Sequence, residues 1–330
     1  MSNKLLNVAI VAGGYSGEYE VSLRSASGIM SWMDADLFSP YLVIIKRDEW
    51  QVALPDGAVV PVCRDDFSFL DTSGQHIKFD YAFITIHGTP GENGLLQGYL
   101  DMLGVPYNTG DVLVESLTFN KFVCNKFLST FPGIRVARAY RLAHGDTIPS
   151  TSDIVSDLGL PLFIKPNVGG SSVATTKVKD EEGIMPAIQS AFEEGNEVMV
   201  ESFIKGTEVT CGCYALGGEI HPLPVTEVVT HNEFFDFNAK YNGQVEEITP
   251  ARISAELTQS IQSLTAQIYH HLRTKGIIRV DFIIEPDGIP TLLEVNTTPG
   301  MTPTSFLPQQ VVAAGLEMKT LLSDIIMDQK

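Results

Sequence analysis

The sequence predicts a mixed α/β fold in which an N-terminal open α/β sheet precedes two further blocks of strands and helices. With 330 residues the chain exceeds one ordinary domain core, so two or three domains are expected. Strand and helix patterns alternate over residues 1–108, as they do in open α/β sheets. Short strands and longer helices then mix over residues 109–202 and 203–330. We expect the domain boundaries to fall between these three blocks.

Each block has its own expected elements. In the first block they are strands at 5–12, 41–46 and 81–86 and helices at 21–33 and 93–104. In the second block they are helices at 118–130, 151–159 and 180–195 and strands at 161–165, 173–178 and 197–201. In the third block they are a strand at 208–216, a long helix at 254–276, two further strands and a last helix.

The composition excludes several classes of protein. A net charge of −18 leaves no basic stripe that could displace counterions, so no nucleic-acid partner is expected. The four cysteines include no C-x-x-C pair, which argues against a zinc or thioredoxin-type site and favours small buried thiols. The N-terminal apolar run is too short for a membrane span and lacks a signal-peptide cleavage pattern. We therefore expect a cytoplasmic protein with no membrane partner.

Two strands near the C-terminus are expected to form a hairpin with a polar face. Asp-Gly at 287–288 is a strong turn pattern, and a loop of two or four residues there gives one and the same register. That register pairs Asp281 with Glu294 and Arg279 with Asn296. Opposed residues share a face of the sheet, so the four side chains are expected to meet there.

This polar face is suited to a metal ion. Asp281, Glu294 and Asn296 supply hard oxygen ligands, which Mg²⁺ binds together with substrate phosphates. The alternative is a surface hairpin with ordinary charge pairs, but two directly opposed carboxylates would then repel each other. A cation removes that repulsion, so we favour the metal site.

A glycine-serine loop follows the strand that ends at Lys165. Glycines 169 and 170 let backbone N–H groups approach a phosphate, and Ser171 and Ser172 add donors. The chain has no Walker A motif, and a flexible hairpin tip is an equally good interpretation of this motif alone. Lys121 and Lys165 could supply charges to phosphates.

The stretch "EVMVESFIKGTE" has the form of an adenosine site. Its strand ends at Glu201, the apolar linker contains Phe203 and Ile204, and Glu208 follows a turn at Gly206. Backbone groups of such a linker can bind the base, and a carboxylate can bind ribose hydroxyls. This pattern alone does not identify an adenosine site.

The first strand runs into a glycine-rich turn. Its glycines at 13, 14 and 17 do not fit the G-x-G-x-x-G fingerprint of dinucleotide-binding folds. Asp34 and Asp36 lie where that fold keeps its ribose carboxylate, so dinucleotide binding is the second interpretation of this turn. Glu18 is better placed to hold a small cationic group. His87 comes directly after a strand and, without its context, is an ordinary loop histidine.

Taken together, these motifs resemble the ATP-grasp enzymes, and most closely the D-alanine–D-alanine ligase family. The likeness extends over the whole chain, through "GGYSGEYEVSLRSA", "HGTPGENGLLQGYLDMLGVPY", "FIKPNVGGSSV", "EFFDFNAKY", "RVDF" and "LLEVNTTPGMTPTSF". It implies an ATP-grasp fold of three domains, with two α+β domains clasping ATP.

The resemblance also implies roles for individual residues. The ATP contacts would be Lys121, Lys165, Ser172, Glu201, Phe203, Ile204, Glu208 and Lys240. The metal ligands would be Asp281, Glu294 and Asn296. The contacts to the two D-alanines would be Glu18 and His87 for the first and Ser305 and Phe306 for the second. The catalytic groups would be Glu18, Ser171, Tyr241, Arg279 and the backbone of Gly300.

The implied reaction joins two D-alanines through an acyl phosphate to make a peptidoglycan precursor. It would use ATP and two Mg²⁺ ions, with Mn²⁺ as a substitute, in a homodimer. The alternatives are another ATP-grasp carboxylate–amine ligase and a non-catalytic nucleotide-binding module. The presence of Arg279 argues against the module, because binding ATP alone needs no oxyanion donor.

The chain departs from the family pattern at two positions. Ala174 stands where glycine is common after the phosphate loop, and Phe306 stands where leucine is common. Residues 242–253, with Arg252, receive no role.

Overall fold

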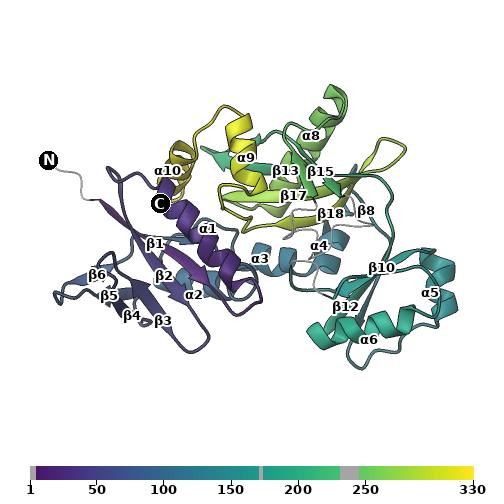
Figure 1. Ribbon diagram of the computed structural model, residues 1–330, viewed down its shortest axis with the longest axis horizontal. Helices are drawn as coiled ribbons and strands as arrows, with labels where there is room; N and C mark the ends of the chain where they lie inside the picture. The colour runs from purple at the N-terminus through teal and green to yellow at the C-terminus, as the bar shows by residue number, and fades with distance from the viewer. Residues whose placement is uncertain (1–4, 171–173, 231–244) are drawn as a thin grey trace.

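The computed structural model describes residues 5–170, 174–230 and 245–330. The strands of these residues form three sheets, and each sheet is accompanied by helices (Figure 1). The predicted mixture of α/β and α+β architecture is confirmed. The predicted boundaries after residues 108 and 202 stay predictions.

The N-terminal sheet has the strand order β6-β5-β4-β3-β2-β1-β7, in which β1 pairs in parallel with β2 and β7. Its strands are β1 (Leu6–Gly13), β2 (Phe38–Ile45), β3 (Trp50–Ala53), β4 (Val59–Cys63), β5 (Ser68–Leu70), β6 (His76–Lys78) and β7 (Tyr81–Ile84). Its helices are α1 (Tyr19–Trp32) and α2 (Leu95–Leu103). Residues 8–13 of β1 are buried without interruption, as expected for a strand covered on both faces. The strands β3 to β6 were not predicted, because they are short and interrupted by polar turns.

A pair of short helices leads out of the N-terminal sheet. The sequence predicts one helix over 118–130, but the structure has α3 (Val112–Phe119) and α4 (Lys121–Leu128). The break is at Asn120, whose side chain accepts a hydrogen bond from the backbone of Val123 at 3.0 Å and so caps α4. Asparagine competes with the helix backbone in this way, which explains why the single-helix prediction is wrong.

The central sheet is antiparallel with the order β11-β10-β12-β9. Its elements are β9 (Ala139–Ala143), α5 (Thr151–Leu158), β10 (Leu162–Pro166), β11 (Thr176–Val178), α6 (Ile184–Glu194) and β12 (Glu197–Ser202). Ser150 caps α5 by accepting a hydrogen bond from the backbone of Asp153. One apolar cluster under α5 and α6 forms the core of this unit.

The C-terminal sheet has the order β16-β15-β13-β17-β18-β8, and β14 pairs with β13. Its strands are β8 (Arg135–Val136), β13 (Thr207–Leu216), β14 (Glu219–Pro222), β15 (Thr226–Thr230), β16 (Val245–Ile248), β17 (Ile277–Ile284) and β18 (Pro290–Asn296). Its helices are α8 (Ala255–Leu272), α9 (Phe306–Ala313) and α10 (Met318–Gln329). The helix α8 ends earlier than predicted, because Arg273 adopts the left-handed conformation that closes it (φ 53°).

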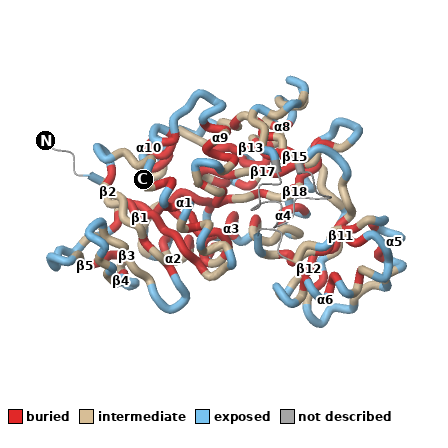
Figure 2. The backbone as a smooth tube through the Cα atoms, viewed as in Figure 1, coloured by how far each residue is buried: buried red, intermediate tan, exposed pale blue. Residues whose placement is uncertain are grey.

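One shared core joins the N-terminal and C-terminal sheets, whereas the central sheet has a core of its own. Buried backbone runs through all three parts of the molecule in Figure 2. Helix α10 packs against α1, and Leu322 and Ile325 share a cluster with Val8 of β1. Residues 121–136 lie beside the C-terminal sheet, because Cys124 belongs to the core under α8. None of the helices in the described part of the chain combines the length and apolar character that a membrane span requires.

Candidate active site

One cleft of about 1220 Å³ is lined by residues from all three sheets. Its floor is the hairpin of β17 and β18, and one wall carries the ends of β10 and β12. The opposite wall consists of residues 16–18 and 87–92, which follow β1 and β7. Each sequence-predicted site residue within the described ranges lies in this cleft. Ser171, Ser172, Lys240 and Tyr241 lie outside the described residues.

The predicted pairing on the hairpin floor is confirmed. Asp281 is opposite Glu294, and Arg279 is opposite Asn296. The alternate residues of β17, such as Val280, are buried in the core under α8. The sheet therefore places the apolar face on the core and the polar face in the cleft.

The predicted loop length is wrong, and a β-bulge compensates for the difference. The backbone N–H of Glu285 donates to the carbonyl of Ile289 at 3.1 Å, so three residues separate the strands instead of two or four. Continued along the strands, that register would place Asp281 opposite Leu293. A bulge with Leu293 as the extra residue restores the pairing of Asp281 with Glu294.

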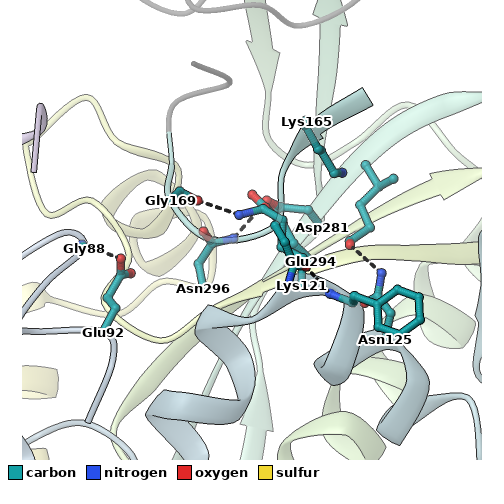
Figure 3. Close-up of polar contacts among 12 residues, drawn as sticks. Gly88, Glu92, Lys121, Asn125, Lys165, Gly169, Asp281, Glu294 and Asn296 are labelled. Atoms are coloured by element: carbon teal, nitrogen blue, oxygen red, sulfur yellow. Dashed lines mark hydrogen bonds and ion pairs between the residues drawn. The ribbon is translucent and has the colours of Figure 1, made fainter. Parts of the chain in front are cut away.

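The bulge is held from below by helix α4. The side chain of Asn125 is buried, and its Nδ2 donates to the carbonyl of Leu293 at 3.2 Å (Figure 3). An extra residue in a bulge leaves its backbone groups outside the ladder of the sheet, so they need other partners. Asn125 supplies one for the carbonyl of Leu293.

Charges of opposite sign are packed together on the hairpin floor. The guanidinium of Arg279 donates from Nε and Nη2 to the two oxygens of Asp281 at 2.9 and 2.8 Å. Nδ2 of Asn296 and the hydroxyl of Thr210 also donate to Asp281, at 3.1 and 2.5 Å. Burial lowers the pKa of Arg279, but the charge of Asp281 and these hydrogen bonds raise it by more. The guanidinium is therefore charged.

The hairpin floor fits a divalent cation by the chemistry of its donors. Two carboxylates and an amide face one cleft, and each carboxylate lies beside a positive side chain. Asp281 has Arg279, and Glu294 has Lys121, whose Nζ lies 3.7 Å from Oε2. The remaining ligands of Mg²⁺ normally come from water and substrate phosphates. Among the described residues no group of three or more His, Cys, Asp or Glu side chains is placed to hold a metal.

Two lysines lie above this floor (Figure 3). Nζ of Lys121 donates to the carbonyl of Gly169 at 2.5 Å, which connects α4 to the glycine loop. Nζ of Lys165 donates to Oε1 of Glu201 at 2.5 Å. Burial lowers the pKa of Lys165, and the charge and hydrogen bond of Glu201 raise it by more, so the net shift is upward. Both lysines line the cleft.

An apolar slot lined by Phe163, Phe203 and Ile204 adjoins the Lys165–Glu201 pair. Phe203 follows β12, and its ring centroid lies 5.9 Å from that of Phe163. Nζ of Lys177 lies 4.1 Å from the centroid of the Phe203 ring. Ile204 lies in the same part of the cleft. The slot offers the aromatic and aliphatic surface that is common in small-molecule sites.

The opposite wall holds the predicted contacts to the first substrate. The hydroxyl of Ser16 donates to the carbonyl of His87 at 2.7 Å and so connects the two glycine-rich turns. Glu18 lies directly below Gly170, where an added Cβ atom would come within 2.5 Å of Oε2. Because residue 170 is glycine, the backbone of the glycine-serine loop can approach the Glu18 carboxylate.

The loop after β18 is anchored on the N-terminal side of the cleft. The hydroxyl of Thr297 donates to Oε2 of Glu115 at 2.6 Å, and that of Thr298 donates to Oε1 of Glu92 at 2.7 Å. Nothing in the sequence singled out Glu115, which lies before the helix predicted at 118–130. Glu92 lies five positions after His87, in a stretch that resembles the family. Its position close to His87 was the only feature of the sequence that pointed to it.

Ser305 and Phe306 lie at the start of α9, across the loop from Gly300. The hydroxyl of Ser305 accepts a hydrogen bond from the backbone of Thr302 at 3.1 Å. The guanidinium carbon of Arg279 lies 5.4 Å from the centroid of the Phe306 ring. Phe306 therefore supports Arg279 as well as lining the cleft.

Arg252, which the sequence leaves without a role, lies beside β15. Its Nε and Nη2 donate to the two oxygens of Glu227 at 2.9 and 3.0 Å. These bonds lower the pKa of Glu227, which lines the cleft.

Comparison with known proteins decides the family. The family models described as D-ala D-ala ligase N-terminus and D-ala D-ala ligase C-terminus match residues 7–110 and 131–327. A D-alanine–D-alanine ligase of Porphyromonas gingivalis is 65% identical over 321 residues, which cover 97% of each chain. The chain belongs to the D-alanine–D-alanine ligase family. A second member, from Bacteroides thetaiotaomicron, is 56% identical over 319 residues, with 97% of this chain and 98% of its own covered.

Solved structures of D-alanine ligases have the same fold. VanG D-Ala:D-Ser ligase from Enterococcus faecalis superimposes with a TM-score of 0.88 at 32% identity, covering 99% of this chain and 100% of its own. The D-alanine–D-alanine ligase from Bacillus anthracis complexed with ATP has a TM-score of 0.78 at 27% identity, covering 98% and 97%. The predicted ATP-grasp fold, family and enzyme class are confirmed, and the interpretation as a non-catalytic module is set aside.

Proposed function

We propose that the protein joins two D-alanines into D-alanyl-D-alanine, with ATP converted to ADP and phosphate, in peptidoglycan precursor synthesis. The observation that carries this proposal is the hairpin floor, on which two opposed carboxylates share one cleft with Arg279 and two lysines. Binding a nucleotide alone needs no guanidinium at a second substrate site. A ligase needs one, because negative charge develops on the attacked carbonyl.

The nucleotide would lie between the central and C-terminal sheets. Its base would occupy the slot at Phe203 and Ile204, and Glu208 would bind the ribose. Lys121 and Lys165 would bind phosphates, together with Ser172 and Lys240. Asp281, Glu294 and Asn296 would hold two Mg²⁺ ions, with Mn²⁺ as a substitute. Such cations neutralise charge on the transferred phosphoryl group.

The two amino acids would lie between the hairpin floor and the N-terminal wall. Glu18 would bind the ammonium of the first D-alanine, and His87 would line its site. Ser305 and the backbone of Phe306 would bind the second carboxylate. The first carboxylate accepts the phosphoryl group, and the second amine then attacks the acyl phosphate. The contacts of Ser305 and Phe306 would bring the attacking amine nitrogen near the carbonyl carbon of the acyl phosphate.

Four further groups would serve the chemical steps. Arg279 and the backbone N–H of Gly300 would stabilise the tetrahedral oxyanion, a role worth on the order of 3 kcal/mol per donor. Tyr241 and Ser171 would close the first site beside Glu18. A neutral phenol at 241 favours an amine as the second substrate, whereas an imidazolium there would favour a hydroxy acid.

We also propose that the protein acts in the cytoplasm as a homodimer. Large apolar side chains are exposed on neighbouring helices α2 and α3: Leu95 is 61% exposed, Met102 81% and Leu113 73%. Leu95 and Met102 are seven residues apart and share a face of α2. Such a face is typical of a protein interface. Sedimentation of Met102→Glu as a monomer, beside a dimeric wild type, would support the dimer.

The function is tested by substrate competition. Phosphate release is measured with ATP, Mg²⁺ and D-alanine, with L-alanine as the control, and D-lactate or D-serine is then added against D-alanine. We expect release with D-alanine only and a dipeptide as the main product at pH 7. Mainly ester product, or release that ignores stereochemistry, would contradict the proposal. Equal kinetics in Tyr241→Phe would show that its hydroxyl plays no part.

A further inference from the structure

A buried carboxyl group contacts the loop after β18 from outside the cleft. Glu115 lies in the middle of α3 and is 0% exposed. Oε2 accepts the hydroxyl of Thr297 at 2.6 Å, and Oε1 lies against the backbone of Gly110. Thr297 follows Asn296, which ends β18 at the hairpin floor. The contact therefore joins a helix of the early chain to a strand 182 positions later.

This carboxyl group is not part of an ion pair that stabilises the fold. The ion pairs among the described residues include none with Glu115. Burial raises the pKa of Glu115 far above its ordinary value, and the nearby charges of Glu92 and Asp111 act in the same direction. A buried polar group is costly unless its hydrogen bonds are made. Loss of the hydrogen bond to Thr297 should therefore change the geometry of the site.

We propose that Glu115 is a positioning residue that aligns the hairpin floor and the loop at 297–300 through the hydroxyl of Thr297. This inference rests on the function proposed above. Asn296 lies one residue before Thr297, and Gly300 lies three residues after it. A rotation of the backbone at Thr297 would move both, and with them one metal ligand and one oxyanion donor.

The same contact aligns Lys121. Helix α3 leads directly through Asn120 into α4, whose first residue is Lys121. The Lys121 ammonium lies 3.7 Å from Glu294 on the hairpin. Glu115 from α3 and Asn125 from α4 thus hold β18 at two points, on either side of Glu294. The helix pair and the hairpin form one block that carries both the lysine and the carboxylates.

The variants that test this are Glu115→Gln, Glu115→Leu and Thr297→Val. Glutamine is neutral and has the same shape, and its amide can hydrogen-bond the Thr297 hydroxyl. Leucine fills the volume without a hydrogen bond. The control is Thr265→Val, which removes a buried hydroxyl in α8 that donates to the carbonyl of Ile261 in the same helix at 2.8 Å. It reports what losing a buried hydrogen bond costs away from the cleft.

We expect Glu115→Leu to lower kcat by about 10- to 100-fold, the usual cost of losing a residue that orients a metal ligand. The KM for ATP should change little, and Glu115→Gln should keep kcat within about threefold of wild type. Thr297→Val should match Glu115→Leu, and the double variant should be no worse than either. Thr265→Val should lower stability with kcat unchanged.

A second measurement does not depend on enzymatic activity. Amide hydrogen exchange in peptides that cover 292–301, measured without substrates, should accelerate in Glu115→Leu and not in Glu115→Gln. The inference is overturned if exchange there is unchanged, if kcat per folded molecule of Glu115→Leu stays near wild type, or if glutamine is as damaging as leucine. If Glu115→Leu does not fold, Thr297→Val supplies the same comparison. A wild type without D-alanine turnover would refute the proposed function and leave the exchange result standing.

Discussion

The hairpin floor and the loop that follows it, residues 297–301, are neighbours in the chain but are held in place in different ways. The hairpin face is formed by its own two strands, and Asp281 and Glu294 oppose each other through local pairing. The loop has no such partner strand. Its threonines bond to Glu115 and Glu92, more than 180 positions earlier in the chain.

This difference separates two kinds of catalytic geometry. The reactive side chains of a hairpin lie on a face that its own strand pairing fixes. A substitution there removes a ligand but leaves the backbone of the hairpin unchanged. A loop takes its geometry from distant residues, so substitutions far from the reacting atoms can move it. Direct ligands should therefore show the largest losses of activity, and anchors should show smaller losses that combine with changes in stability.

The largest effect should come from Glu294→Gln. It removes one of the two opposed carboxylates, and we expect kcat to fall on the order of 1000-fold while the fold remains. Steady-state phosphate release and circular dichroism measure the two parts. The matched control is Asp287→Asn, an acid-to-amide change at the exposed tip of the same hairpin. Near-normal activity of Glu294→Gln in Mg²⁺ would show that this carboxylate is not a ligand.

Arg279→Lys should have the next largest effect. Lysine cannot form the two parallel hydrogen bonds to Asp281, and it cannot present a planar donor to the oxyanion. We expect kcat to fall by about 100-fold, with the KM for ATP changed much less. Arg135→Lys is the control, because Arg135 of β8 pairs with the carboxylates of Glu285 and Asp287 at the exposed tip of the same hairpin. Equal effects of the two changes would remove the special role of Arg279.

Asn125→Leu tests the bulge. The carbonyl of Leu293 would lose its buried donor, so we expect the free energy of unfolding to fall by about 1–2 kcal/mol. Because the bulge sets the pairing of Asp281 with Glu294, kcat should also fall, by about 10-fold. Urea denaturation and steady-state kinetics measure both. A loss of stability with unchanged kcat would mean that the hairpin keeps its register without help from α4.

The smallest effect should come from Arg252→Gln, in a pair that belongs to neither region. The hydrogen bonds of Arg252 hold the pKa of Glu227 below its ordinary 4.5, so the pair stabilises the fold above that pH. The stabilisation is lost as the pH falls through the lowered pKa of the folded state. The difference in stability between wild type and variant should therefore be constant from pH 7 to 5 and shrink at lower pH. A difference that grew toward acid would contradict this sign.

The sequence predicted the parts of the site that depend on local pattern. Alternation was sufficient to place Asp281 and Glu294 on the polar face, and their pairing was predicted from a turn at Asp287-Gly288. The loop length was wrong and the bulge was missed, because the partner of the extra residue is Asn125, which comes from a helix far away in sequence. The split of the 118–130 helix had a local signal, Asn120, which was not read as a cap.

Glu115 could not have been predicted in this way. Its position in α3 becomes buried only because β18 and the loop at 297–298 pack across that helix. Burial of a helical carboxylate is a property of the tertiary structure, and the residue itself has no pattern that distinguishes it from a solvated one. The family likeness supplied the functional residues, and the structure supplies the contacts that hold them.

Binding of Mn²⁺ tests the central claim, that the carboxylate pair of the hairpin holds cations with the nucleotide. Free Mn²⁺ is followed by electron paramagnetic resonance in the presence of a non-hydrolysable ATP analogue, for wild type, Asp281→Asn, Glu294→Gln and the control Asp287→Asn. We predict two nucleotide-dependent Mn²⁺ ions per chain in wild type and in the control, and at least about 10-fold weaker binding in the other two variants. Unchanged Mn²⁺ affinity in Asp281→Asn and Glu294→Gln would contradict the assignment of the hairpin floor as the metal site.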